Sequence, residues 1–159
     1  MDKVAVRDAL VKRLRAEADK ARASATATRE GATHEESRAE NDKDTRGLEA
    51  SYLARGQAKR VEQLEEAIVR VRVMELPDYG ELPIGLGALV EVLIDDDDER
   101  TFFLASAGGG EKLEVEGQAI HVLTPASPVG RALVGKRVDD ELELTVAGRV
   151  RLYELTAVR

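Results

Sequence analysis

The chain of 159 residues has no cysteine, no tryptophan and only two histidines. Without cysteine there is no disulfide framework, thiolate nucleophile or cysteine-ligated zinc site, and His34 and His121 are too few for a histidine-based metal cluster. Met1-Asp2-Lys3 leads directly into a charged segment, and no run of about 18 apolar residues occurs, so we expect neither a signal peptide nor a membrane span. A cytoplasmic location and a small fold of one or two domains are therefore predicted.

Proline is absent from residues 1–76, and Tyr52 is the only aromatic residue in that stretch. An alanine-, arginine- and glutamate-rich segment of this kind predicts helix. Residues 1–76 carry a net charge of +1, whereas residues 77–159 carry −8. This asymmetry indicates that the two parts of the chain meet different partners, and it disfavours a uniformly basic surface that coats nucleic acid.

Two apolar stripes with heptad spacing run through the first part. The first stripe contains Val4, Val11, Leu14, Ala18, Ala21, Ala25 and Thr28, with Arg7 as its only charged member. The second contains Ala50, Ala54, Gln57, Val61, Leu64, Ile68 and Val71. Both stripes lose bulk toward the middle, so they predict an antiparallel hairpin with a thick base and a slender tip. About 27 residues per arm at ~1.5 Å rise give a length of roughly 40 Å.

The segment between the two helices is polar and acidic. From Glu35 to Asp44 it has five acids, two bases and no apolar residue larger than alanine. Gly31 and Asn41-Asp42 are poor helix formers, so a turn is predicted at the far end of the hairpin, with an acidic tip near residues 35–45.

The second part of the chain has short β-branched or alternating runs that predict a sheet of five strands. These runs are residues 86–94, 100–105, 117–123, 141–146 and 149–156. Asp95–Asp98 and Ala147-Gly148 fit hairpin turns. Ser127 as N-cap, Pro128 at the first helical position and Gly135 at the end predict a short helix over 129–134. The fold class is α+β, with an antiparallel sheet.

We expect three further features of the sequence to have no binding or catalytic role. The four aspartates of residues 95–98 are expected to be solvated, and His121 to be a partly exposed strand residue. Gly108-Gly109-Gly110 lacks the strand and helix context of a phosphate-binding loop and is expected to be flexible.

The segment Ser127-Pro128-Val129-Gly130-Arg131-Ala132-Leu133-Val134-Gly135-Lys136, followed by Asp139-Asp140, resembles the signature of the GreA/GreB transcript-cleavage factors of bacterial RNA polymerase. Residues 87–92 and 148–155 are similar to the family's opening strand and closing hairpin. The resemblance implies a coiled-coil hairpin over residues 1–76, a linker over 77–83 and an FKBP-like domain over 84–159.

The resemblance also implies a function. The C-terminal domain would dock on RNA polymerase at the rim of the secondary channel, with Ser127, Pro128, Arg131 and Lys136 as partner-binding residues. The hairpin would reach the active site, where tip acids help to hold a Mg²⁺ ion of the polymerase and its attacking water, so that backtracked RNA is cleaved near its 3′ end. The protein would bind no cofactor alone and would not be an enzyme by itself.

The tip departs from the family pattern, which reads roughly Gly-Asp-Leu-x-Glu-Asn-x-Glu-Tyr. Matching Glu-Asn to Glu40-Asn41 places Ser37 at the aspartate position, and alignment through the second helix places Glu40 and Lys43 at the two acidic sites. The auxiliary catalytic and metal-binding residues are therefore predicted to be Glu40, Asp42 and Asp44, which offer the hard oxygen ligands that Mg²⁺ prefers.

Alternatives remain beside cleavage stimulation. The altered tip favours a regulator that occupies the secondary channel and inhibits synthesis without promoting cleavage. A third hypothesis is a helical-hairpin adaptor that is unrelated to transcription. A prolyl isomerase is disfavoured because its pocket needs an aromatic lining, and this part of the chain offers only Tyr79, Phe102, Phe103 and Tyr153. Nothing demands a dimer, so a monomer is expected.

Overall fold

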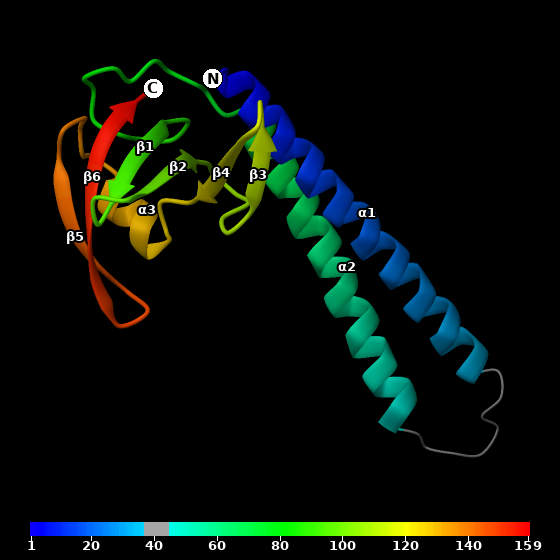
Figure 1. Ribbon diagram of the computed structural model, residues 1–159. Coiled ribbons are helices and arrows are strands. Elements are labelled where there is room, and N and C mark those ends of the chain that lie inside the picture. The colour runs from blue at the N-terminus through cyan, green and yellow to red at the C-terminus, as the bar shows by residue number, and fades with distance from the viewer. Residues whose placement is uncertain (37–44) are drawn as a thin grey trace. The chain divides into compact units, whose positions relative to one another are not determined.

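The computed structural model describes residues 1–36 and 45–159 (Figure 1). The chain divides into two compact units: one is Arg13–Ile68, and the other combines Met1–Lys12 with Val69–Arg159. Among the described residues, no helix combines the length and the apolar character needed to cross a membrane.

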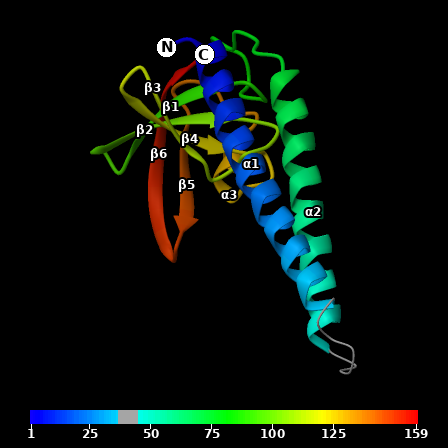
Figure 2. The same ribbon diagram turned by 90° about the vertical axis from the view of Figure 1, so that its right-hand side faces the viewer.

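The first unit is an antiparallel pair of helices, as the two stripes predict. Helix α1 spans Lys3–Glu36 and α2 spans Thr45–Arg72, and the two run side by side in opposite directions (Figure 2). Leu14, Leu64 and Ile68 are buried where the stripes are bulky. Farther along, Ala25 and Ala54 are only half-buried, which confirms that packing thins away from the base.

The prediction of which residues of the first stripe are buried is wrong over the first two turns of α1. Val4 is 45% exposed, whereas Val6 and Leu10 are completely buried. The reason is that the start of α1 belongs to the unit that holds the sheet, where the Leu10 side chain packs against Gly108. Burial here therefore follows a second set of neighbours and not the helix–helix seam.

The sheet of the second unit has six strands in its described residues, in the order β3-β4-β2-β1-β6-β5 (Figure 1). The strands are β1 Leu89–Ile94, β2 Asp98–Leu104, β3 Lys112–Val115, β4 Gln118–Leu123, β5 Glu141–Val146 and β6 Arg149–Val158. The pairs are antiparallel except β2 and β4, which are parallel.

Strand β3 and the parallel pair are not predicted from the sequence. Strand β3 has four residues and buries only Leu113, so its hydrophobic signal is weak. Because β3 lies between β2 and β4 in the chain, β4 returns beside β2 in the same direction. Two parallel strands need such an intervening connection, whereas the predicted sheet had only antiparallel strands.

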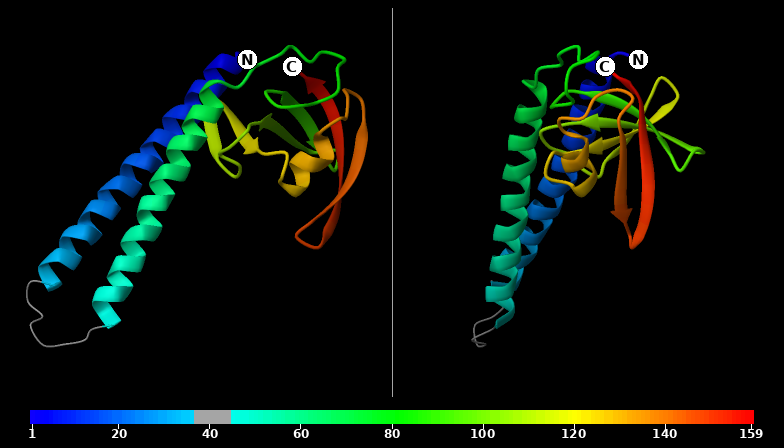
Figure 3. Two further views of the ribbon diagram at one scale, coloured as in Figure 1. Left: turned by 180° about the vertical axis from the view of Figure 1, so that it is seen from behind. Right: turned by 90° about the vertical axis from the view of Figure 1, so that its left-hand side faces the viewer.

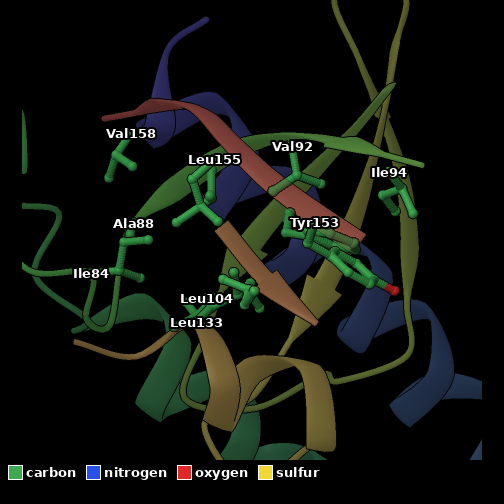
Figure 4. Packing of buried hydrophobic residues seen from close by; sticks show 12 residues of the cluster. Ile84, Ala88, Val92, Ile94, Leu104, Leu133, Tyr153, Leu155 and Val158 are labelled. Carbon is green, nitrogen blue, oxygen red and sulfur yellow. The ribbon is translucent and has the colours of Figure 1, made fainter. Parts of the chain in front are cut away.

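One face of the sheet packs under the short helix α3, Pro128–Leu133 (Figure 4). Alternate residues of β1, such as Val92 and Ile94, meet Tyr153 and Leu155 of β6 and Leu133 of α3 in one cluster. Burial of each such side chain contributes about 1.5–3 kcal/mol. This cluster fixes α3, and with it the signature segment, on the sheet.

The turns follow the sequence in two places and differ in a third. Asp95 and Ala147 have positive φ values of 52° and 51°, in tight hairpin turns as expected. Gly108, by contrast, is not part of a loose glycine run. It adopts φ +79° against Leu10, and the neighbouring Gly110 N–H donates to the Val122 carbonyl at 2.9 Å.

Candidate functional site

Helix α3 begins at a complete N-terminal cap. The Ser127 hydroxyl accepts a hydrogen bond from the Gly130 N–H at 3.1 Å and donates one to the Thr124 carbonyl at 2.8 Å. Pro128 follows at the start of the helix, where its fixed φ is favourable and no N–H is required. Ser127 and Pro128 of the signature therefore have a structural role in the N-terminal cap of α3, and this role does not depend on a partner.

Gly130 is required by close packing. A Cβ at this position would lie 2.8 Å from the Ser127 hydroxyl oxygen and still closer to the Thr124 carbonyl oxygen, so any larger residue collides with the cap. Gly135 serves a different purpose, because its φ of +83° ends the helix in the left-handed region. Its N–H donates to the Ile84 carbonyl at 2.8 Å, and the Ile84 N–H donates to the Lys136 carbonyl at 2.7 Å.

Basic side chains lie exposed around this short helix. The Arg131 guanidinium donates to the Ala126 carbonyl at 3.2 Å, and Arg137 donates to the Glu81 carbonyl. Lys136 is exposed, and in the described residues its ammonium has no ion-pair partner. We call Arg131, Lys136 and the cap residues Ser127 and Pro128 the α3 surface. These four predicted residues all lie within the ten consecutive positions 127–136, at α3 and in the turn that follows it.

Polar contacts join the two arms of the hairpin. Arg22 of α1 pairs with Glu65 of α2, and Arg60 of α2 lies 3.4 Å from Glu17 of α1. Farther from the base than both ion pairs, the Gln57 amide donates to the Ser24 hydroxyl at 3.1 Å. Exposed ion pairs add little stability, but a polar pair in a helix–helix seam specifies which residues face each other.

Comparisons with known proteins cover both units. The family model described as transcription elongation factor GreA/GreB, C-term, matches residues 83–159. GreA of Mesorhizobium japonicum is 32% identical over 111 residues, 70% of this chain and 66% of that protein. The transcription inhibitor protein Gfh1 of Thermus thermophilus is 31% identical over 128 residues, 74% of this chain and 73% of that protein. The chain belongs to the GreA/GreB family.

The relatives are matched over part of their length. GreA of Rhodospirillum rubrum is 29% identical over 100 residues, and the match spans 60% of that protein. Among solved structures, Gfh1 of Thermus aquaticus is 25% identical, with 95% of this chain and 94% of that chain covered and a TM-score of 0.39. Another Gfh1 structure has a TM-score of 0.42.

The acidic tip of this GreA/GreB member lies outside the described residues. Glu40, Asp42 and Asp44 fall between the end of α1 at Glu36 and the start of α2 at Thr45. Their role stays a prediction. In the part of the chain that the structure describes, no three histidine, aspartate or glutamate side chains form a group that could hold a metal ion.

Two of the four aspartates of residues 95–98 pair with arginines of the sheet, and Asp95, Asp96 and Asp97 are exposed to solvent as expected. Asp98 forms a two-pronged ion pair with Arg100, at 2.7 and 3.0 Å, which lowers the pKa of Asp98. Asp95 accepts from Arg151 and from the Leu152 N–H, each at 2.9 Å. These contacts give Asp95 and Asp98 a structural role. Arg151 is 56 residues away from Asp95, so no local sequence signal could have identified it.

His121 is half-buried on β4, as expected for a structural histidine. Its ring lies edge-on to Phe102, with 6.0 Å between the ring centroids. Burial and the positive charges of Arg100 and Lys112 lower its pKa below the ordinary value of 6.5. The imidazole is therefore favoured in its neutral form, and it is placed within the sheet rather than at the α3 surface.

Proposed function

We propose that this GreA/GreB member is an accessory factor of bacterial RNA polymerase. The α3 surface holds the factor on the polymerase, and the hairpin carries the acidic segment 35–45 into the secondary channel. The observation that carries the proposal is the match to Gfh1 over 128 residues, because that region is longer than either part of the chain and must include residues of both. A named transcription factor is thus similar to residues of the hairpin part and of the sheet part in one match.

The hairpin is physically suited to entering a narrow channel. Its seam is filled by Leu14, Leu64 and Ile68 at the base and by small residues beyond Ala21. Small seam residues allow two helices to approach closely, so the far half of the arm is slim. Ion pairs between the arms, such as Arg22 with Glu65, help to keep them in register.

The first form of the proposal is stimulation of RNA cleavage. The polymerase active site uses Mg²⁺, a hard cation that prefers carboxylate oxygens and water as ligands. Glu40, Asp42 and Asp44 supply such oxygens at the end of the arm. They would help to hold the ion and orient the attacking water, and the polymerase would carry out the cleavage near the 3′ end of the nascent RNA.

The second form is inhibition without cleavage. Two observations favour it: a relative that is named a transcription inhibitor is matched over 73% of its length, and the tip does not retain the family's paired carboxylates. In this form the arm occupies the channel and slows nucleotide addition. The α3 surface has the same role in both forms.

One assay separates the two forms. Stalled, backtracked RNA polymerase complexes are incubated with the protein in Mg²⁺, and released 3′ RNA fragments are measured beside the rate of elongation. Cleavage stimulation predicts faster fragment release, which is lost in a Glu40→Gln, Asp42→Asn, Asp44→Asn variant that still binds. Inhibition predicts slower elongation with no extra fragments.

A matched control removes three exposed carboxylates elsewhere, through Glu62→Gln, Glu66→Gln and Glu75→Gln. If this variant lost activity to the same extent as the tip variant, net charge and not the tip would be responsible. If the wild-type protein changed neither cleavage nor elongation, both forms of the proposal would be wrong.

The docking half of the proposal is tested by binding. Replacing Arg131 and Lys136 with alanine should weaken binding to RNA polymerase about tenfold, because exposed cations at an interface contact acidic groups of the partner. The control variant, Lys112→Ala with Arg149→Ala, removes two exposed cations from the same unit. Equal binding by both variants would exclude the α3 surface as the docking site.

A further inference from the structure

The two arms of the hairpin pack differently near the base and farther out (Figure 3). Near the base, Ala18, Leu64 and Ile68 are buried at the seam between the helices. Farther out, none of the described residues 19–31 and 47–63 is buried. We call one part the base segment, residues 13–23 and 58–68, and the other part the outer segment, residues 24–36 of α1 and 45–57 of α2.

The large apolar side chains in the outer segment of α2 do not fill the seam. Leu48, Tyr52 and Leu53 are each more than half exposed. Helical segments of about 12–15 residues are marginally stable in water when they have no tertiary packing. Residues 24–36 and 45–57 are segments of this length, so their helical structure depends on the weak packing between the two arms.

Glycine weakens the outer segment further. The three glycines of residues 1–76, Gly31, Gly47 and Gly56, all lie in the outer segment. A Cβ at any of the three would have no heavy atom within 4 Å, so packing does not require glycine there. Within a helix, glycine is less favourable than alanine because it loses more backbone freedom on folding. The glycines therefore lower the stability of the outer helices without improving their packing.

A polar layer lies at the inner end of the outer segment. The Gln57 amide donates to the Ser24 hydroxyl, and the buried Gln57 Oε1 atom accepts no hydrogen bond from the described residues. An unsatisfied buried acceptor disfavours the closed arrangement, because water can reach the same oxygen when the arms separate. The ion pair between Arg22 and Glu65 lies on the base side of this layer. The seam is therefore weakest from the polar layer outward.

We propose that the outer segment opens and closes as one unit, separately from the base segment, with the Ser24–Gln57 layer as the boundary. Regions with few buried apolar contacts open at a lower free energy than the core of the same protein. The two arms share one seam, so loss of one outer helix removes the packing of the other.

The opening has a consequence for binding. Only closed molecules can bind a partner that contacts both arms, so the apparent affinity falls in proportion to the closed fraction. Exposed positions such as Gly56 would then tune the affinity without touching the partner. The proposal concerns the hairpin alone, so it does not depend on the function proposed above.

The test is hydrogen exchange of backbone amides in the full chain, measured by NMR under conditions in which the rate reports the opening equilibrium. Corrected for intrinsic rates, amides of residues 25–31 and 50–56 should exchange at least about tenfold faster than amides next to Leu14 and Leu64. Gly31→Ala should slow exchange about fourfold in the outer segment of both arms, because alanine stabilises the α1 helix and the arms close together.

Ile68→Val is the matched change in the base segment. It removes a buried carbon, so amides next to Leu64 should exchange several-fold faster, while outer amides should change less than about twofold. Gln57→Leu removes the unsatisfied oxygen and adds apolar area to the seam. Outer amides should therefore exchange at least about fivefold more slowly in this variant.

Four results would overturn the proposal. Equal protection of the outer and base segments, or an Ile68→Val effect of the same size in both, would mean that the hairpin opens as a whole. A Gly31→Ala effect confined to α1 would mean that the arms open independently of each other. Unchanged outer exchange in Gln57→Leu would exclude the polar layer as the boundary.

Discussion

Gly130 and Gly56 are two glycines at which the same substitution, glycine to alanine, should change stability in opposite directions. Gly130 lies in α3, where an added Cβ would be 2.8 Å from the Ser127 hydroxyl oxygen and 2.9 Å from the Thr124 carbonyl carbon. The Thr124 backbone cannot move aside as a flexible side chain could. Gly56 lies in α2, and a Cβ there would have no heavy atom within 4 Å.

The magnitudes follow from these environments. Gly130→Ala should lower the free energy of unfolding by about 3 kcal/mol, the upper part of the range for overpacking, because the cap of α3 must open. Gly56→Ala should raise it by about 0.8 kcal/mol, since alanine is the better helix former and meets no obstacle. For a chain of this size, 1 kcal/mol corresponds to a shift in Tm of about 2–4 °C.

The assay is urea unfolding followed by NMR of backbone amides, because the two substitutions lie in different units and each needs its own signals. Amides of β1 and β6 report on Gly130→Ala, and amides in the middle of α2 report on Gly56→Ala. A Gly130→Ala protein as stable as wild type would refute the packing argument at the cap. A destabilised Gly56→Ala protein would show that the outer surface of α2 is not open at this position.

Three further changes test other parts of the structure. Leu64→Ala, at a side chain only 3% exposed, should destabilise the hairpin by about 2–5 kcal/mol in thermal unfolding, and a smaller loss would mean that the seam is loosely packed. Ser127→Ala should cost about 1 kcal/mol in urea unfolding through loss of the α3 cap, with Ser127→Asp retaining most of the stability. Because the pKa of His121 lies below 6.5, the unfolded chain takes up a proton first as the pH falls, so stability should decrease as the pH falls through about 6.5. His121→Asn should flatten that part of the profile, and an unchanged slope would exclude His121 as its source.

Local patterns predicted much of the fold because local physics determines it. The two heptad stripes contain no proline and their residues become smaller toward the middle, which predicted two helices that pack through a narrowing seam. Leu14 and Leu64 are buried as predicted. The short helix could be predicted from the local sequence, because the conformational roles of Ser127, Pro128 and Gly135 depend only on the nearest few residues. The resemblance of this segment to the GreA/GreB signature then led to the family.

Tertiary structure decided what depends on residues far apart in the chain. Val6 and Leu10 are buried in place of Val4 because the start of α1 packs in the unit that holds the sheet, which no helical repeat encodes. The parallel pairing of β2 with β4 depends on the path of the chain through β3. Glu141 of β5 lies directly opposite Glu154 of β6, and only the strand register brings these two carboxylates together. The sequence by itself therefore determined the elements and the family signature, because these depend on neighbours within a few residues. The tertiary structure decided which faces are covered and which charges meet, because those depend on pairing across the whole chain.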